Sequence, residues 1–467
     1  MKNINLTEKI PQILKEIAVE ITNCGGRTVL VGGVVRDLLL KLPLKDFDLE
    51  IYGIDNFDTL KAILTKYGSV NEVGKAFAVL KFTAKKIEAD FAFPRTENKI
   101  GKGHKGFQII SDPNLDFKEA ALRRDFTINS MGIDLITHEF LDPFNGKKDL
   151  LEKKLIKHVG PKFTEDPLRI YRAMQFAARF NLTIDPETLE IAKACDLTEL
   201  PKERIFEEVK KMFLLSKKPS IGLSYWPKLG IIKEFPELEA LIGVPEEPLW
   251  HPEGDVWTHT LMVVDEMAKT KQGDSKKDLV FLLAALTHDF GKPKTTAYIE
   301  GSWRSRGHED EGVEPAKKFL MRLTNETDLI SEVLKLVKEH LKPALLYKDN
   351  LKNPVSDGAI RRLSLRVNIL DLLKIAEADH FGRSTADAIE REFPAGEWLL
   401  KKAQELQVKD EKPKPLIMGR DLLDLGFKSS PELGKILKAC FELQLEGTLT
   451  TKEELLNYAR NFPENKD

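Results

Sequence analysis

The spacing of apolar residues changes once along this chain of 467 residues, near residue 147. Before that point, short apolar runs such as TVLVGG and FAVLKFTA alternate with turn residues, which is typical of intermixed strands and helices. Beyond it, segments such as DPLRIYRAMQFAARF repeat their apolar residues at helical spacing. The pattern predicts an α+β fold in which a mixed head is followed by all-helical domains.

This plan divides the chain into five expected parts. They are an N-terminal helix over 1–25, a head over 26–145, a helical neck and body over 146–245, a third domain over 250–400, and a C-terminal helical unit over 415–463. The segment EEPLWHPEGD is expected to be a rigid connector before the third domain. No apolar run approaches the roughly eighteen residues of a bilayer span, so we expect a cytoplasmic protein without a membrane partner. The sequence leaves its oligomeric state open.

The segment VGGVVRDLLLKLPLKDFDLEIYG joins two glycines to a pair of carboxylates, Asp46 and Asp48. Alternating residues of a strand share a face, so we expect both carboxylates to point the same way and to need a cation. Mg²⁺ suits such oxygen ligands, and two ions can hold an in-line displacement at phosphorus. Gly32 and Gly33 would let backbone N–H groups approach a triphosphate beside Arg36. The glycine pair alone is more typical of a tight turn, and the carboxylate pair alone is more typical of a solvated strand. Their order within one segment favours the catalytic interpretation.

Further motifs follow in a fixed order: FPRTENKIGKGHKGF, LRRDFTINSM, DPFNGKKDL and EDPLRIYRAMQFAARF. With them the chain resembles the class II tRNA CCA-adding enzymes and bacterial poly(A) polymerases of the polymerase-β superfamily. The resemblance implies metal binding by the two aspartates of KDFDLE and triphosphate contacts from Gly33, Arg36 and Arg124. Asp90, in IEADFAF, is expected to assist deprotonation of the attacking hydroxyl, with solvation at a strand edge as the alternative.

The function that this resemblance implies is template-independent addition of CCA to tRNA 3′ ends by two-metal nucleotidyl transfer. Its expected partners are tRNA, CTP and ATP, and its expected cofactor is Mg²⁺. A poly(A) polymerase, or an enzyme that adds only CC or only A, would carry the same motifs and stays an alternative. The formal net charge of −2 disfavours the poly(A) polymerase, since binding arbitrary RNA benefits from a strongly basic chain.

Asp166, Arg169 and Arg172 lie three residues apart in EDPLRIYRAM, and on a helix such residues form one ridge. Alone, such a ridge is more often a surface ion-pair ladder. Beside nucleotidyltransferase motifs, Asp166 is expected to accept from the exocyclic amine of cytosine or adenine while Arg169 donates to the adjoining ring nitrogen, which rejects U and G. The resemblance implies a further nucleotide contact from Arg172 and a bracing role for Arg204 and Glu208.

Histidine is concentrated in the expected third domain. Six of the nine histidines lie there: His251, His259, His288, His308, His340 and His380. A single buried histidine is more often a satisfied core residue. The order of His259, His288-Asp289 and Asp379, each among apolar residues, nevertheless resembles the HD metal-dependent phosphohydrolases.

The HD resemblance implies a metal site made by those four residues. Imidazole ligands favour a divalent transition metal, Ni²⁺, Co²⁺ or Mn²⁺. His308 and His340 are candidates for substrate contact or a second ion. Hydrolysis of phosphomonoesters and cyclic 2′,3′-phosphodiesters is the implied activity. An HD phosphohydrolase whose N-terminal half only binds RNA is the alternative of another class.

Overall fold

The computed structural model describes residues 6–73, 79–99, 107–198 and 200–462. The chain folds into two compact units, one of residues 1–212 and 228–230 and one of residues 213–227 and 231–467. The first unit contains the expected N-terminal helix and head and the first part of the expected neck and body over 146–245, whose remainder falls mostly in the second unit. The five-part division itself stays a prediction. Part of the FPRTENKIGKGHKGF motif, residues 100–106, lies outside the described residues. None of the described helices combines the length and apolar content needed to cross a bilayer.

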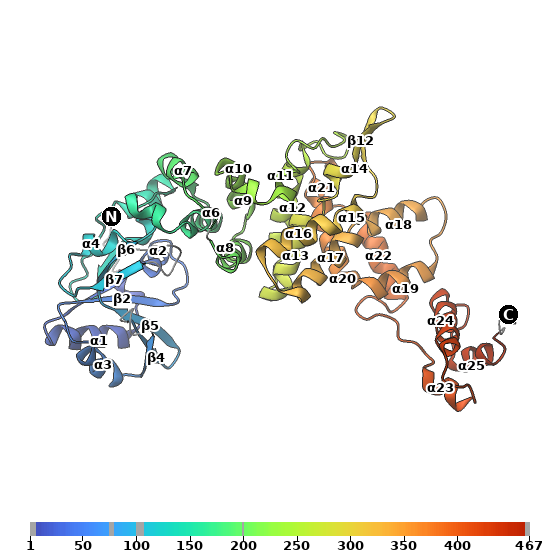
Figure 1. The fold of residues 1–467 in the computed structure, drawn as a ribbon, viewed down its shortest axis with the longest axis horizontal. Helices are drawn as coiled ribbons and strands as arrows, with labels where there is room; N and C mark the ends of the chain where they lie inside the picture. The colour runs from blue at the N-terminus through green and yellow to red at the C-terminus, as the bar shows by residue number, and fades with distance from the viewer. Residues whose placement is uncertain (1–5, 74–78, 100–106, 199, 463–467) are drawn as a thin grey trace. The chain divides into compact units, whose positions relative to one another are not determined.

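A seven-stranded sheet is the frame of the first unit (Figure 1). In sheet order its strands are β3 (Ser69–Val73), β4 (Val79–Ala84), β5 (Ile87–Ala92), β2 (Phe47–Tyr52), β1 (Arg27–Val31), β8 (Gly132–Asp134) and β9 (Phe140–Leu141). The pair β2–β5 is parallel, and the other neighbours in this sheet are antiparallel. Separate from it, β6 (Arg95–Lys99) and β7 (Phe107–Ser111) form an antiparallel hairpin.

The N-terminal helix α1 (Gln12–Asn23) belongs to the head. Its buried residues Leu14, Ile17 and Ile21 fall on one face at helical spacing. That face packs against β1 and against α3 (Phe57–Thr65), which lies beside α1 in Figure 1. The helix therefore covers one side of the sheet.

Further helices complete the first unit, some between the strands and some after them. They are α2 (Gly33–Leu39), α4 (Phe117–Ala121), α5 (Gly146–Lys148), α6 (Leu168–Phe180), α7 (Pro186–Lys193) and α8 (Lys202–Leu215), whose last residues enter the second unit. One feature of this region differs from the all-helical expectation beyond residue 147. Two short strands, β10 (Leu155–Ile156) and β11 (Thr183–Ile184), pair in parallel across α6. Strands of two residues are too short to give a periodic signal.

The second unit is built around α13 (Ser275–Thr287). All its residues from Asp278 to Thr287 are buried, as expected of an interior helix that is apolar on every side. It packs against α12 (Val256–Lys269), α17 (Thr327–Glu339) and α20 (Ile369–Phe381). Figure 1 shows these helices in one cluster.

Further helices surround this cluster. They are α9 (Ser220–Leu223), α10 (Tyr225–Lys228), α11 (Pro236–Glu239), α14 (Lys292–Thr295), α15 (His308–Glu311), α16 (Val313–Leu323), α18 (Lys342–Asn350), α19 (Asp357–Arg366), α21 (Ala386–Glu390) and α22 (Pro394–Glu405). A hairpin of β12 (Thr296–Ile299) and β13 (Ser302–Ser305) corrects the expectation that residues 256–400 are helical throughout. Thr, Tyr and Trp in this stretch favour strands, which was the available local signal.

The C-terminal segment forms a small group of three helices with its own apolar cluster. The helices are α23 (Gly419–Asp424), α24 (Pro431–Glu446) and α25 (Lys452–Arg460). Leu422 and Cys440 are fully buried in this cluster. The group joins the rest of the second unit where α24 packs on α19.

Candidate active sites

The first site lies where β2 and β5 run side by side. Asp48 is the register partner of Asp90 on the parallel strand, so both carboxylates project from one face of the sheet. Asp46 differs from the expectation. It precedes the strand, which begins at Phe47, and its φ of +52° puts its backbone in the left-handed region. Asp48 therefore shares its face of the sheet with Asp90, while Asp46 is positioned by the turn before the strand.

The pKa of Asp48 is raised to about 6. Partial burial of the carboxyl group is the main cause, and the negative charges of Asp90 and Asp46 add to it, while the Arg124 guanidinium opposes the shift. A carboxylate crowded by like charges is stabilised by a cation. This oxygen-only donor set fits Mg²⁺.

Gly32 brings the start of α2 close to these carboxylates. Its φ of +79° favours glycine, and a Cβ there would lie 2.9 Å from Arg124 Nη1 and 3.6 Å from Asp48 Oδ2. Arg124 donates to the Asn129 carbonyl at 3.2 Å and pairs with Glu50 at 2.8 Å. Its Nε is buried and makes no hydrogen bond to the described residues. The glycine, the guanidinium and the metal-type carboxylates therefore converge on one spot.

Arg36 lies behind this spot and is almost wholly buried. It donates to Asn129 Oδ1 at 2.6 Å and pairs with Asp37 at 2.7 Å. Its guanidinium also lies over the rings of Phe176 and Phe180 on α6. In this structure Arg36 thus joins α2 to α6, while Gly33 leaves room for its side chain.

The three residues of the predicted base-recognition ridge do not lie on one helical face. Asp166 is extended and precedes α6, which begins at Leu168, so only Arg169 and Arg172 lie on the helix. Asp166 forms an ion pair with Arg204 of α8 at 3.2 Å. Proline at position 167 explains the break, because the residue before proline disfavours helical backbone.

The two arginines of α6 have separate partners. Arg169 donates to the carbonyls of Lys162 and Arg123, at 2.8 and 2.7 Å. Arg172 pairs with the buried Asp125 at 2.7 Å, and its Nη1 lies 3.9 Å from Glu208. Arg204 and Glu208 thus contact different residues of the predicted recognition segment, namely Asp166 and Arg172.

The second site gathers residues from two helices and from the turn that follows a third helix. His259 is on α12, His288 and Asp289 follow α13, and Asp379 is on α20. His259 Nε2 lies 3.0 Å from Asp379 Oδ1, and His288 Nε2 lies 3.0 Å from Asp289 Oδ2 and 3.8 Å from Asp379 Oδ1. All four residues are buried. The structure therefore brings together residues that are up to 120 positions apart.

Two further histidines complete a second cluster on the same aspartate. His308 Nε2 lies 3.2 Å from Asp289 Oδ1 and 3.3 Å from His340 Nε2. Gly291 makes this approach feasible, because a Cβ there would lie 2.1 Å from the His308 carbonyl oxygen. Asp289 therefore offers one oxygen to each cluster.

Hydrogen bonds set the tautomers of three of these rings. His288, His308 and His340 donate Nδ1–H to the carbonyls of Ala285, Ser305 and Val337, at 2.8, 2.7 and 2.6 Å. In the neutral ring this leaves a lone pair on each Nε2 directed into the site. Among the described residues, the buried His288 Nε2 makes no hydrogen bond, although it lies 3.0 Å from Asp289 Oδ2, an oxygen that is also paired with Lys292. Facing lone pairs without a proton between them fit divalent metal ions.

The pKa values reflect this crowding. Burial lowers the pKa of His340 to about 3, assisted by repulsion from His308 and His288. Burial also disfavours the charged form of His259, but hydrogen bonds to Asp379 and Glu253 raise its pKa to about 9. A metal ion at His259 Nε2 would take the place of that proton.

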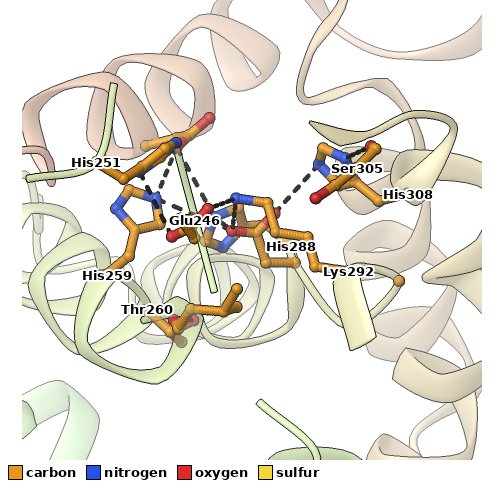
Figure 2. Close-up of polar contacts among 12 residues, drawn as sticks. Glu246, His251, His259, Thr260, His288, Lys292, Ser305 and His308 are labelled. Atoms are coloured by element: carbon orange, nitrogen blue, oxygen red, sulfur yellow. Dashed lines mark hydrogen bonds and ion pairs between the residues drawn. The ribbon is translucent and has the colours of Figure 1, made fainter. Parts of the chain in front are cut away.

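A basic and acidic shell surrounds the clusters (Figure 2). Lys292 forms ion pairs with Asp289 at 2.8 Å and with Glu246. Glu253 Oε1 lies 2.8 Å from His259 Nδ1 and 3.0 Å from His251 Nδ1. In Figure 2, His251 and His259 lie at one side of the site and His308 at the other. WHPEGD therefore contributes to the site and is more than a connector.

Sequence reasoning missed several residues of the two sites. Glu50 is buried between Arg123 and Arg124, and Lys292 is buried beside the HD pair. The available signal for Glu50 was its place among apolar strand residues, where a charge needs a partner. Lys292 was signalled by its place one turn after Asp289.

Comparisons with known proteins match three stretches of the chain to family models. A poly A polymerase head domain matches residues 28–157, a probable RNA and SrmB-binding site of polymerase A matches 181–242, and an HD domain matches 256–391. A multifunctional CCA protein of Xanthomonas oryzae pv. oryzae is 35% identical over 382 residues, which are 79% of this chain and 87% of that protein. One of Stenotrophomonas maltophilia is 37% identical over 388 residues, 79% of this chain and 89% of that protein.

Solved structures of CCA-adding enzymes have a similar fold. The Bacillus stearothermophilus enzyme in complex with CTP aligns with a TM-score of 0.64 and 17% identity over 96% of this chain and 98% of that chain. The Thermotoga maritima enzyme complexed with tRNA aligns with a TM-score of 0.60 and 20% identity over 98% of this chain and 97% of that chain. At these identities the likeness shows the fold alone.

Proposed function

This chain belongs to the family of multifunctional CCA proteins, and we propose that it adds C, C and A to the 3′ end of tRNA from CTP and ATP without a template. The arrangement around β2 carries this proposal. Asp48 and Asp90 share one face of the sheet, and Gly32 brings the start of α2 against Arg124. We place the reaction in the cytoplasm, where tRNA and both nucleotides occur together.

In the proposed reaction, the tRNA 3′ oxygen attacks the α-phosphorus of the nucleotide, and pyrophosphate leaves. Asp46 and Asp48 would hold Mg²⁺, which when bound stabilises the charge that develops at phosphorus. Asp90 accepts the proton of the attacking hydroxyl. Its place beside Asp48 supports this role, since a base must lie within reach of the attacking group.

The triphosphate would bind at the start of α2. Gly32 and Gly33 leave the backbone open to phosphate oxygens, and Arg124 supplies positive charge. Arg36 supports this segment from behind through Asn129.

Base selection belongs to the segment around Asp166. Its carboxylate accepts from the amine of cytosine or adenine, and Arg169 donates to the ring nitrogen. Arg204 orients Asp166 through their ion pair, and Arg172 adds a nucleotide contact. U and G place a carbonyl where the amine should be, so the Asp166 carboxylate is left without a hydrogen-bond donor.

One experiment tests the addition reaction and its alternatives. Labelled tRNA lacking its 3′ end is incubated with CTP, ATP, both, or UTP and GTP, and the products are sized. Two residues added with CTP and one more with ATP support CCA addition. A long tail with ATP alone would indicate a poly(A) polymerase, and CC or A alone would indicate a partial enzyme. No addition would favour an N-terminal half that only binds RNA.

We further propose that the second unit is a metal-dependent phosphohydrolase. The clusters of His259, His288 and Asp289 and of Asp289, His308 and His340 support it, since each brings its donor atoms within 4.8 Å of one another. Asp379 would complete the first cluster, and the second would hold a second ion. Imidazole ligands favour Ni²⁺, Co²⁺ or Mn²⁺ here.

Assays across a metal series test this second proposal. The substrates are a phosphomonoester and a 2′,3′-cyclic nucleotide, and bound metal is counted by elemental analysis. Hydrolysis that depends on a transition metal, with Mg²⁺ sufficient for CCA addition, supports the proposal. Identical metal preferences of the two reactions would contradict it.

A further inference from the structure

Arg123 connects two parts of the proposed nucleotide site in the first unit. Its backbone carbonyl accepts a hydrogen bond from Nη2 of Arg169, the proposed donor to the base, at 2.7 Å. Its side chain donates from Nη2 to Glu50 Oε1 at 2.9 Å. The same oxygen accepts from Nη2 of Arg124, the proposed triphosphate ligand, at 2.8 Å. Three hydrogen bonds therefore lead from the base-recognition arginine to the triphosphate arginine.

Glu50 does not offer each of these arginines an oxygen of its own. Its second oxygen, Oε2, accepts from the Tyr52 hydroxyl at 2.9 Å, so Arg123 and Arg124 share Oε1. Glu50 is buried, and the Nε groups of both arginines are buried without a hydrogen bond to the described residues. A closely packed interior transmits small displacements. A shift of Arg123 therefore changes how Arg124 is paired.

The backbone of Arg123 is held from the base side by one guanidinium. Arg169 Nη1 donates to the Lys162 carbonyl at 2.8 Å while Nη2 donates to the Arg123 carbonyl, and these two bonds use two of its five N–H groups. Cytosine and adenine offer a ring nitrogen that accepts from another N–H, which leaves both carbonyl bonds intact. Uracil and guanine present a ring N–H there, which repels the guanidinium and weakens its hold on Arg123.

The side chain of Arg123 belongs to a closed ring of contacts. Its Nη1 lies 3.5 Å from Glu97 Oε1 on β6, and Lys162 Nζ donates to the Glu97 carbonyl at 2.8 Å. The two residues whose carbonyls Arg169 holds thus both contact Glu97 as well. Such a ring fixes the Arg123 side chain in one arrangement relative to its own backbone, as transmission between two sites requires.

We propose that Arg123 is a positioning residue that couples base recognition at Arg169 to triphosphate binding at Arg124, so that a wrong base also weakens the hold on the triphosphate. The inference rests on the proposed nucleotidyl transfer and adds a specificity-determining residue to it. Direct contacts to the base alone would give the same selectivity whatever the number of phosphates. Coupling gives a greater selectivity among triphosphates than among monophosphates, which lack the groups that Arg124 would bind.

Nucleotide binding to the full chain tests this coupling. No addition occurs without tRNA, so equilibrium dialysis in the presence of Mg²⁺ measures Kd for CTP, UTP, CMP and UMP. In the wild type, we expect the ratio of Kd values for UTP and CTP to exceed the ratio for UMP and CMP about ten-fold. Arg123→Lys should make the two ratios equal, because an ammonium group lacks the planar fork that contacts Glu50 and Glu97 together. Binding of CMP and UMP should not change.

Arg27→Lys is the matched control. Arg27 lies on β1 of the same unit and also pairs with two carboxylates, Asp134 at 2.6 Å and Glu139 at 2.7 Å. Both ratios should keep their wild-type values in this variant. Arg123→Met, which removes every side-chain donor at this position, is a second test variant and should also equalise the ratios. Melting temperatures establish that each variant is folded.

The outcomes separate this inference from the proposed function. Equal ratios in the wild type, or a difference that survives in both Arg123 variants, would overturn the coupling and leave the proposed nucleotidyl transfer standing. A smaller ratio for UMP and CMP in these variants would also overturn it, since Arg123 would then act on the base alone. Absence of saturable CTP binding to the wild type would instead overturn the proposed function, and the coupling with it.

Discussion

At the scale of single residues, burial and pairing decide how each charged group acts. Asp48 is crowded by Asp90 and Asp46, and its pKa is raised although Arg124 opposes the shift, which is typical of a carboxylate in a cation site. Glu50, two residues on, instead pairs with Arg123 and Arg124 and is buried. One strand thus carries Asp48, which we propose binds a metal ion, and Glu50, which is paired within the fold.

Asp48→Asn should reduce nucleotide addition at least about 100-fold, because the variant loses a negative metal ligand. The melting temperature and tRNA binding should stay close to the wild type. Asp55→Asn, in an exposed loop of the same unit, is the matched control. Addition is measured by extension of labelled tRNA. Substantial extension by the Asp48 variant would remove this residue from the catalytic site.

Glu50→Gln should destabilise the first unit in a pH-dependent way. Burial raises the pKa of Glu50, but Arg124 and Arg123 more than offset this, so the folded-state pKa is lowered. Such a carboxylate stabilises the fold above its unfolded pKa of about 4.3, and the contribution is lost as pH falls through the folded pKa. We expect a loss of about 3 kcal/mol at pH 7 for breaking this buried pair.

Urea unfolding followed by hydrogen exchange in peptides from β2 measures this effect. The difference between wild type and Glu50→Gln should shrink as the pH is lowered below about 4.3. Glu88→Gln, an exposed carboxylate on β5, provides the control. A difference that does not change with pH would show that the charge of Glu50 contributes nothing.

At the scale of elements, the ends of helices and strands place the functional groups. Asp46 lies just before β2, Asp166 just before α6, and His288 just after α13. A residue outside a regular element is free of the element's periodicity, so its side chain is aimed by tertiary contacts. This explains why Asp166 meets Arg204 on α8 and does not lie in line with Arg169.

Arg204→Ala should weaken base selection in the same direction as Asp166→Ala. Without the ion pair, the Asp166 carboxylate loses its orientation, and we expect misincorporation of U or G to rise about ten-fold. KM for the triphosphate should change less, since Arg124 and the glycines still bind it. Lys210→Ala, on the same helix, pairs with Glu207 and serves as the control. Selection that survives in Arg204→Ala, with loss in Asp166→Ala, would make Arg204 a structural residue only.

At the scale of the whole molecule, the two sites lie in different compact units. The carboxylates of the first site belong to residues 1–212, and the histidine clusters belong to residues 231–467. Each site is built from its own core residues, so a change in one should leave the other folded.

His288→Ala should reduce phosphohydrolysis at least about 100-fold and leave CCA addition unaltered. His288 is a donor of the first cluster, and the variant should also bind less transition metal, which elemental analysis measures. His380→Ala is a histidine control on the same helix as Asp379, because its ring Nε2 donates to the Glu392 carbonyl and belongs to neither cluster. Loss of both activities in His288→Ala would show that the units depend on each other.

The sequence by itself determined the local chemistry of this protein. The change of apolar spacing near residue 147 predicts the mixed head and the helical remainder, and the order of motifs predicts the family. These features are local, because strand and helix periods and motif spacing are written in consecutive residues. They place the candidate ligands on segments that the structure brings together.

Only the tertiary structure decided which side chains meet. Asp48 pairs in register with Asp90, and Asp289 joins two histidine clusters. Trp250 and Trp303 line one cavity. Each of these relations joins segments that are distant in the sequence, and chain packing sets them without leaving a periodic signal in either segment. The sequence did not predict the short strands or the turn at Asp46 for the same reason. The pairing partner or the turn geometry decides such conformations.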